Sequence, residues 1–314
     1  MARGGSLARS TAYLRLTHSL GESNALQTAV ARFVPRGGER ELIVDLVAAV
    51  HYADAGYYAA LNRLLDRYDA VLYELVAPLG TRPVGGGAGA DNPLTLVQRV
   101  AQSLLGLQSQ LERVDYTRSK FVHADLSPAQ LWEGVRARGD DQVTLLLGIA
   151  ADVLRESNRA AGRATTANAS QQRDLDLFEA FTRPGGRTEL KRAIAGELVL
   201  HGTRLMPTLE RLLIVDRNRA AMRELRAQIA AGKRRIAIFY GAGHMADFER
   251  RLRRELGLRR TKVEWLTAWD LRPSDESPLE GMLQAVAGEL LRPAVPPPAS
   301  PIPPRLPRRR VYAP

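Results

Sequence analysis

Two segments of the chain, residues 42–76 and 209–270, repeat one order of elements, and this repetition limits the fold more than any other feature. In the first segment an apolar strand runs into His51-Tyr52-Ala53-Asp54, and in the second a strand runs into His244-Met245-Ala246-Asp247. A helix follows each motif, and a further strand opens 20 positions after His51 and 19 positions after His244. Strands that alternate with helices are typical of parallel β-α-β units. We therefore predict an α/β fold with a mostly parallel central sheet built from two related β-α-β halves.

Hydrophobic periodicity within the chain assigns the individual elements. It predicts helices over 55–65, 220–230 and 246–256, and strands over 28–34, 42–50, 70–75, 212–215, 235–240 and 262–268, the first two forming a hairpin. Residues 94–205 carry Leu and Ala at helical spacing, which predicts a large helical insertion between the two halves. The glycine-rich stretch 80–93 is expected to be a linker or insertion loop, because no Lys-Ser/Thr pair follows it to make a phosphate-binding loop.

The end of the chain, residues 292–314, differs in composition from the rest. It contains nine prolines, five arginines and no acidic residue, and proline lacks the N–H that a helix or central strand requires. We expect one α/β domain over residues 1–291 and a flexible Pro/Arg-rich tail over 292–314 that is free to contact a partner.

Positive charge is concentrated in residues 211–262, which carry fifteen basic and five acidic side chains within a chain of net charge +11. A basic stripe can bind phosphate backbones, but here aromatic side chains are not interleaved with the arginines to stack on bases. Arg250, Arg251, Arg253 and Arg254 instead suit the solvated face of a helix. Nucleic acid is therefore not an expected partner.

Cysteine is absent from the sequence, which excludes disulfides, iron–sulfur clusters, Cys-ligated zinc and a thiol nucleophile. Any metal would have to be held by His, Asp or Glu. No apolar run reaches the ~20 residues of a membrane-spanning helix, and the amino terminus lacks the apolar block of a secretory signal. We expect a cytoplasmic protein without a transmembrane segment.

Three polar side chains, His51, Glu74 and His244, lie where predicted strands end, and the carboxyl edge of an open α/β sheet is where binding sites are built. Glu74 is a lone carboxylate in an apolar strand, which we expect to lie beside the strand that leads to His51. Without a partner its burial would cost roughly several kcal/mol. Two imidazoles and a carboxylate can hold a catalytic divalent metal. The same residues also suit a metal-free site in which Glu74 orients a histidine general base.

Residues around these three offer further contacts. Gly241 and Gly243 are expected to reverse the chain before His244, because glycine accepts positive φ, and the following helix amino terminus favours an anion or a developing oxyanion. Tyr240 either hydrogen-bonds an oxyanion or packs in the core.

Arg217 and Asn218 close the predicted strand 212–215 and begin a helix, and each has two interpretations. Arg217 either binds a substrate carboxylate or phosphate or an oxyanion, or pairs with Asp216 or Glu74, while Asn218 either belongs to the site or caps the helix. His123 and Asp125 either accompany the start of a helix near Pro128 or reach the site as a ligand or supporting partner.

Taken together, these motifs resemble the TraB/Tiki superfamily, which is related to the erythromycin esterases and the haem-binding ChaN proteins. The resemblance covers residues 42–76 and 209–270 and rests on His51 with Asp54, the strand 69–75 with Glu74, Asp216-Arg217-Asn218 followed by Met222, and Gly241-Ala242-Gly243-His244. It implies an active site of two Gly-x-x-His histidines and the intervening glutamate, with Arg217 and Asn218 as the Arg-Asn pair of the family. Tiki members are described as metal-dependent proteases. In the first motif Ala48 stands where the family has glycine.

The leading expectation is a hydrolase. A divalent metal such as Mn, Co or Zn, held by His51, Glu74 and His244, would activate a water that attacks a peptide, amide or ester carbonyl. Arg217 or Tyr240 would stabilise the tetrahedral intermediate, and Asn218, Gly241 and Gly243 would contact the substrate. Two alternatives remain: a metal-independent esterase with a histidine general base, and a haem-binding, ligand-binding or regulatory protein without turnover.

Overall fold

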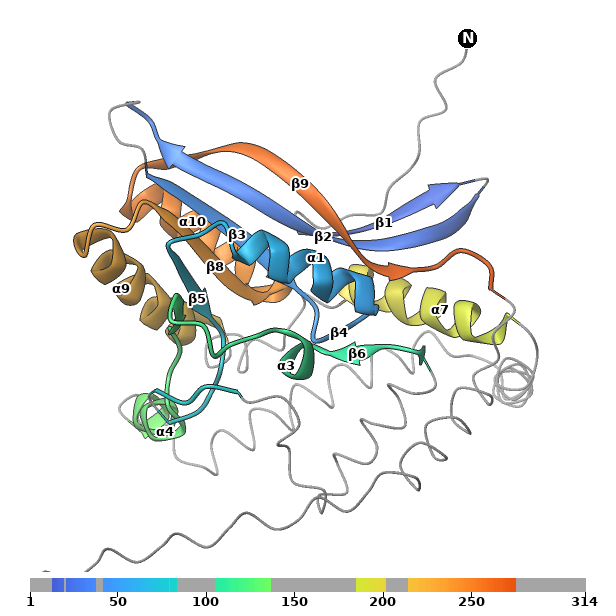
Figure 1. The fold of residues 1–314 in the computed structure, drawn as a ribbon, viewed down its shortest axis with the longest axis horizontal. Coiled ribbons are helices and arrows are strands. Elements are labelled where there is room, and N and C mark those ends of the chain that lie inside the picture. Colours follow the sequence, from blue (N-terminus) through green and yellow to red (C-terminus); the bar gives the residue numbers. More distant parts are fainter. Residues whose placement is uncertain are drawn as a thin grey trace, which may run out of the picture.

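A mixed sheet of seven strands organises the part of the chain that the computed structural model describes, residues 13–19, 21–37, 42–78, 80–83, 105–136, 185–201 and 214–274 (Figure 1). Its strands lie in the order β1 (Leu14–Ser19), β2 (Glu22–Pro35), β3 (Ile43–Ala49), β8 (Arg235–Gly241), β5 (Ala70–Tyr73) and β7 (Phe121–His123), and β9 (Leu258–Asp270) pairs with β2. A separate short pairing joins β4 (Tyr52–Ala53) and β6 (Gln108–Ser109).

Within this sheet β2 alone runs against the other strands. It pairs antiparallel with β1, β3 and β9, whereas β3, β8, β5 and β7 pair in parallel with one another in that order. The central strand β8 has five consecutive buried residues, Ile236 to Tyr240, as expected for a parallel strand covered on both faces. The prediction of a mostly parallel sheet in an α/β fold is confirmed.

The two β-α-β segments are interleaved in the sheet. The first strand of the second segment, β8, lies between β3 and β5, the two strands of the first segment. The expectation that Glu74 follows a strand adjacent to the strand leading to His51 is therefore wrong. The continuous apolar run of β8 requires a neighbour on each side and cover on both faces, and the central place in the sheet provides these.

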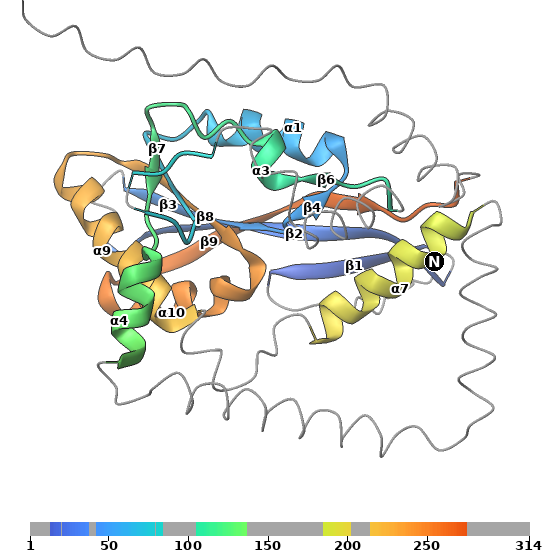
Figure 2. The ribbon, with the colours of Figure 1, turned by 90° about the horizontal axis from the view of Figure 1, so that it is seen from below.

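Helices cover both faces of the sheet (Figure 2). On one side lies α1 (Ala55–Leu65), which connects β3 to β5, and on the other lies α10 (Met245–Glu255), which connects β8 to β9, with α9 (Asp216–Ala230) beside it. Buried Leu61 and Leu65 of α1 and Phe248 and Leu252 of α10 belong to one continuous core. The predicted helices 55–65 and 246–256 are confirmed to within one residue.

Two predicted regions differ from the structure in the type of element they contain. The end of the predicted strand 212–215 is helical, with Val215 at φ −66° and ψ −48° directly before α9, while 212–213 lie outside the described residues. A short apolar run does not distinguish a buried strand from a buried helical turn. The described parts of 94–205 contain the helices α3 (Gln110–Arg113), α4 (Pro128–Arg136) and α7 (Gly186–His201), but also β6 and β7, so this region is not helical throughout.

Several predictions concern residues outside the described ranges. These are the glycine-rich stretch from 84 to 93, most of the proposed helical insertion and the tail 292–314. Among the described helices, none is long and apolar enough to cross a bilayer.

Candidate functional site

Parallel pairing brings the candidate residues to one edge of the sheet. β3 and β8 are in register up to Ala49 opposite Gly241, and Tyr73 at the end of β5 lies opposite Phe239 of β8. His51 and Glu74 follow shortly after β3 and β5, and His244 ends the 3-10 turn η2 (Ala242–His244) that follows β8. Because the carboxyl ends of parallel strands share an edge, these three residues meet there.

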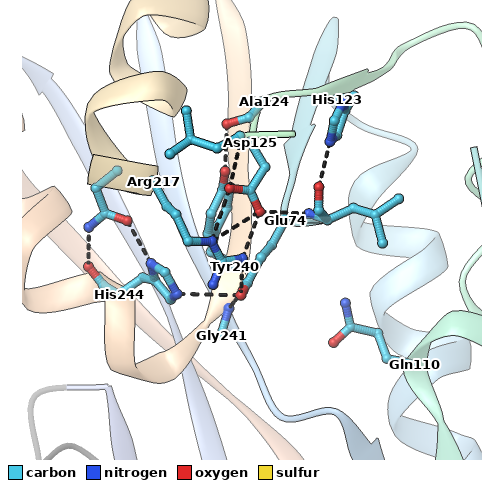
Figure 3. A network of polar contacts seen from close by, with 12 residues as sticks. Glu74, Gln110, His123, Ala124, Asp125, Arg217, Tyr240, Gly241 and His244 are labelled. Atoms are coloured by element: carbon cyan, nitrogen blue, oxygen red, sulfur yellow. Dashed lines mark hydrogen bonds and ion pairs between the residues drawn. The ribbon is translucent and has the colours of Figure 1, made fainter. Parts of the chain in front are cut away.

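Glu74 is at the centre of the polar network (Figure 3). Its Oε1 accepts a hydrogen bond from Arg217 Nη2 at 2.7 Å, and its Oε2 accepts one from the backbone N–H of Gly241 at 2.7 Å. His244 Nε2 lies 3.4 Å from Oε1. Burial by itself would raise the pKa of Glu74, but the hydrogen bond and charge of His244, the charge of Arg217 and the Gly241 amide outweigh it and hold the pKa well below its ordinary value. Glu74 is therefore ionised at neutral pH.

Gly241 is needed for close approach and not for an unusual backbone angle. Its φ is −54°, and neither Gly241 nor Gly243 is among the glycines of positive φ. The expectation of a positive-φ chain reversal at this motif is therefore wrong. A Cβ placed on Gly241 would lie 3.3 Å from Glu74 Oε2, 3.9 Å from His244 Cδ2 and 4.0 Å from His51 Nε2. The glutamate and both histidines therefore face one point beside Gly241, and any side chain there would crowd the carboxylate.

The first motif, Ala48 to His51, has no position at which a close approach requires glycine. The strand neighbour of Gly241 is Ala49, and Ala48, which stands where the family motif has glycine, is a fully buried core residue. The departure from Gly-x-x-His thus leaves the placement of His51 intact.

His51 is the exposed member of the three, whereas His244 is 5% exposed. The carbonyl of His51 accepts a hydrogen bond from the backbone N–H of Gln110 at 2.8 Å, so α3 holds this part of the chain. A substrate arriving from solvent would therefore meet His51 before His244.

Asn218 fixes the orientation of His244. Its Nδ2 donates to the carbonyl of His244 at 3.1 Å and to Asp247 Oδ2 at 3.0 Å, which leaves Oδ1 to face His244 Nδ1 at 2.6 Å. Because an amide oxygen only accepts, Nδ1 of His244 carries a proton and Nε2 is directed at Glu74. Asn218 lies inside α9 and makes no helix cap, so the capping interpretation is wrong.

Arg217 is bound by two carboxylates. Its Nε and Nη2 donate to Asp125 Oδ1 and Oδ2 at 3.0 and 2.6 Å, in addition to the bond to Glu74. Burial would lower the pKa of Arg217, but the hydrogen bond to Asp125 and the charges of Glu74 and Asp125 raise it above its ordinary value. Of the two interpretations, the structure places Arg217 in an ion pair with Glu74, where it positions the carboxylate.

Asp125 is a central residue of the site that the sequence suggested only as one of two alternatives. Besides binding Arg217, it accepts the backbone N–H groups of Leu75 at 3.0 Å and Leu126 at 2.8 Å. It follows the carboxyl end of β7, and the rule that selected Glu74 after β5 would have selected Asp125 had this strand been recognised. His123 does not reach the site, because its Nε2 donates to the Leu75 carbonyl at 2.5 Å.

Tyr240 belongs to the core beside the site. Its hydroxyl donates to the carbonyl of Ala124 at 2.6 Å, and its ring meets that of His244 edge-on, with the centroids 5.2 Å apart. Burial raises the pKa of Tyr240 well above its ordinary value. The hydroxyl is therefore neutral and already has an acceptor, so an oxyanion role is not favoured.

The charges of the buried cluster do not cancel. Arg217 carries one positive charge against the two carboxylates of Glu74 and Asp125, whose side chains are 12% and 0% exposed. One negative charge is left over in this cluster, and His244 Nε2 lies 3.4 Å from its Glu74 Oε1 atom.

A divalent metal at His51, Glu74 and His244 requires three donors around one ion. The donor types are suitable, but in the described part of the chain no three His, Asp or Glu side chains are placed to hold a metal ion. Glu74 already accepts hydrogen bonds from Arg217 and Gly241, and the guanidinium lies 2.7 Å from the oxygen nearest His244. A metal bound to this oxygen would therefore lie beside the positively charged guanidinium of Arg217.

Comparison of the chain with family models, curated proteins and solved structures finds no match. The resemblance to the TraB/Tiki superfamily therefore rests on the sequence motifs alone.

Proposed function

We propose that the chain is a hydrolase of the TraB/Tiki type, in which His51, Glu74 and His244 act on a peptide, amide or ester carbonyl with a histidine as general base. The observation that carries this proposal is the ionised, buried carboxylate of Glu74, which faces one exposed and one buried imidazole at a single point. General base hydrolysis requires at least a base that solvent can reach and a charged group beside it, here His51 and Glu74.

In this mechanism His51 takes a proton from a water molecule as the water oxygen attacks the carbonyl carbon. The surplus negative charge of the Glu74 and Asp125 cluster stabilises the imidazolium that forms, and the proton then passes to the leaving group. Arg217 and Asn218 are positioning residues, since Arg217 holds Glu74 and Asn218 orients His244. Gly241 binds Glu74 through its amide, so it also acts through the carboxylate.

The metal-dependent alternative, with Mn, Co or Zn on His51, Glu74 and His244, predicts a different response to chelation. Dialysis against a strong chelator leaves the metal-free hydrolase active, and elemental analysis then finds no stoichiometric metal. Activity that disappears on dialysis and returns with one of these ions would replace the mechanism above with the metal-dependent one.

The test of the proposal uses Glu74→Gln and His51→Ala, assayed on a chromogenic ester and on an unstructured protein substrate. We expect each change to lower kcat/KM by roughly 10²–10⁴-fold, the usual contribution of a general base. His18→Ala is a matched control, because His18 lies on β1, separated from β5 by three strands. Circular dichroism verifies the fold of each variant. Turnover by Glu74→Gln and His51→Ala at the wild-type rate would contradict the proposal, and a Soret band on adding haem without turnover would favour the ligand-binding alternative.

A further inference from the structure

A cavity of about 180 Å³ lies at the opposite end of the parallel strands from Glu74. Its walls come from the amino-terminal halves of β3 and β8, from β2 and β9, and from the end of α1 and the turn after it. Four cationic side chains and two carboxylates line it: Arg32, Arg67, Arg235, Lys262, Asp45 and Glu264. The cavity is therefore cationic, with four positive charges against two negative ones.

Both carboxylates of the cavity already have cationic partners. Asp45, which is 1% exposed, accepts two hydrogen bonds from Arg32, at 3.0 and 2.9 Å, and a third from the hydroxyl of Tyr68 at 2.7 Å. Glu264 forms an ion pair with Lys262 on the same strand. These two pairs use two of the four cations and both carboxylates.

Among the residues that the structure describes, the side chains of Arg67 and Arg235 form no hydrogen bond or ion pair, and both residues hydrogen-bond only through the backbone. Their charges act without direct contact on the carboxylates of Glu264 and Asp69, respectively. In having no ion pair within the described residues, Arg235 differs from several other arginines of the basic segment 211–262. Arg226 pairs with Glu255 and Arg253 with Glu249. Ion pairs on α9 and α10 thus neutralise part of the positive charge of that segment.

We propose that this cavity binds a phosphate group, either inorganic phosphate or the phosphate of a small phosphomonoester. Guanidinium groups donate parallel pairs of hydrogen bonds to phosphate oxygens, and two unpaired guanidiniums match the charge of a phosphate dianion. The volume is several times the ~30 Å³ that a water molecule occupies in the liquid, which accommodates a phosphate. The site is distinct from the hydrolase site, because it lies at the amino ends of β3 and β8, whereas Glu74 and His51 follow carboxyl ends.

The experiment titrates inorganic phosphate into the full chain by isothermal titration calorimetry, at constant ionic strength and pH 7.5, and follows the melting temperature in parallel. Phosphate that binds the folded state raises the melting temperature, and the stabilisation grows with the logarithm of one plus the ratio of the phosphate concentration to Kd. The double variant Arg67→Gln/Arg235→Gln is expected to weaken binding by roughly tenfold or more, because charged hydrogen bonds are lost. Arg63→Gln is the matched control, since Arg63 is exposed on α1 and does not line the cavity.

A variant that is expected to bind phosphate more tightly makes the test independent of any folding defect. Glu264→Gln removes an exposed negative charge from the cavity and releases Lys262, so it should tighten phosphate binding several-fold. A second titration compares inorganic phosphate with glycerol phosphate. The ligand that binds more tightly shows whether the cavity takes free phosphate or a phosphomonoester. Equal stabilisation by chloride at the same ionic strength, or unchanged affinity in both the double variant and Glu264→Gln, would overturn the proposal.

Discussion

Replacing Arg217 by methionine tests whether the buried cluster is held by one guanidinium. The substitution removes the charged hydrogen bonds from Arg217 to Asp125 and Glu74 and leaves both carboxylates buried. Removing one member of a buried ion pair costs about 3–5 kcal/mol, which is a large share of the ~5–15 kcal/mol by which folded domains are stable. We therefore expect the free energy of unfolding of Arg217→Met to fall by about 3–5 kcal/mol at pH 7.

Urea denaturation followed by circular dichroism measures this loss. The matched control is Arg219→Met on the same helix, whose side chain is 52% exposed and pairs with Asp216 at 2.9 Å; such exposed pairs contribute about 0–1 kcal/mol. In Arg217→Met one of the cations that oppose the burial of Glu74 is missing, so the pKa of Glu74 rises and the group binds a proton at a higher pH than in wild type. Lowering the pH should then stabilise the variant relative to wild type.

Two results would refute this reasoning. One is a stability loss in Arg217→Met no larger than that in Arg219→Met. The other is a difference from wild type that does not shrink between pH 7 and pH 4.5. Adding Asp125→Asn to Arg217→Met removes one of the unpaired carboxylates, and it should recover about 1–3 kcal/mol.

Two further predictions concern Glu74 and its neighbour. The pKa of Glu74 is lowered in the folded state, so its contribution to stability is complete above the ordinary glutamate value of 4.5 and is lost as the pH falls toward the folded-state pKa. Between pH 5 and pH 3 the free energy of unfolding of Glu74→Gln should therefore fall less than that of wild type, as measured by urea denaturation. Parallel profiles of this free energy against pH in the two proteins would contradict the assignment. Gly241→Ala places a methyl group 3.3 Å from Glu74 Oε2, whereas Gly243→Ala has its nearest contact at 4.0 Å. We expect Gly241→Ala to lower kcat/KM at least roughly tenfold through displacement of the carboxylate and Gly243→Ala to retain activity, and equal activities would exclude a close-approach role for Gly241.

The sequence alone determined the elements whose patterns are local. The helical spacing in 55–65 predicted α1, and the apolar runs predicted β3, β5 and β8, because side-chain periodicity depends on near neighbours. It also placed His51, Glu74 and His244 at strand ends, and from there the common edge of a parallel sheet followed.

The tertiary structure alone decided how these elements are combined. The place of β8 between β3 and β5 depends on contacts between segments far apart in the chain, which no local pattern records. The roles of Arg217 and Asp125 depend on β7, a strand of three residues that is too short to show a period. The function of Gly241 likewise depends on a carboxylate brought to it from another strand, and this could be seen only as a distance.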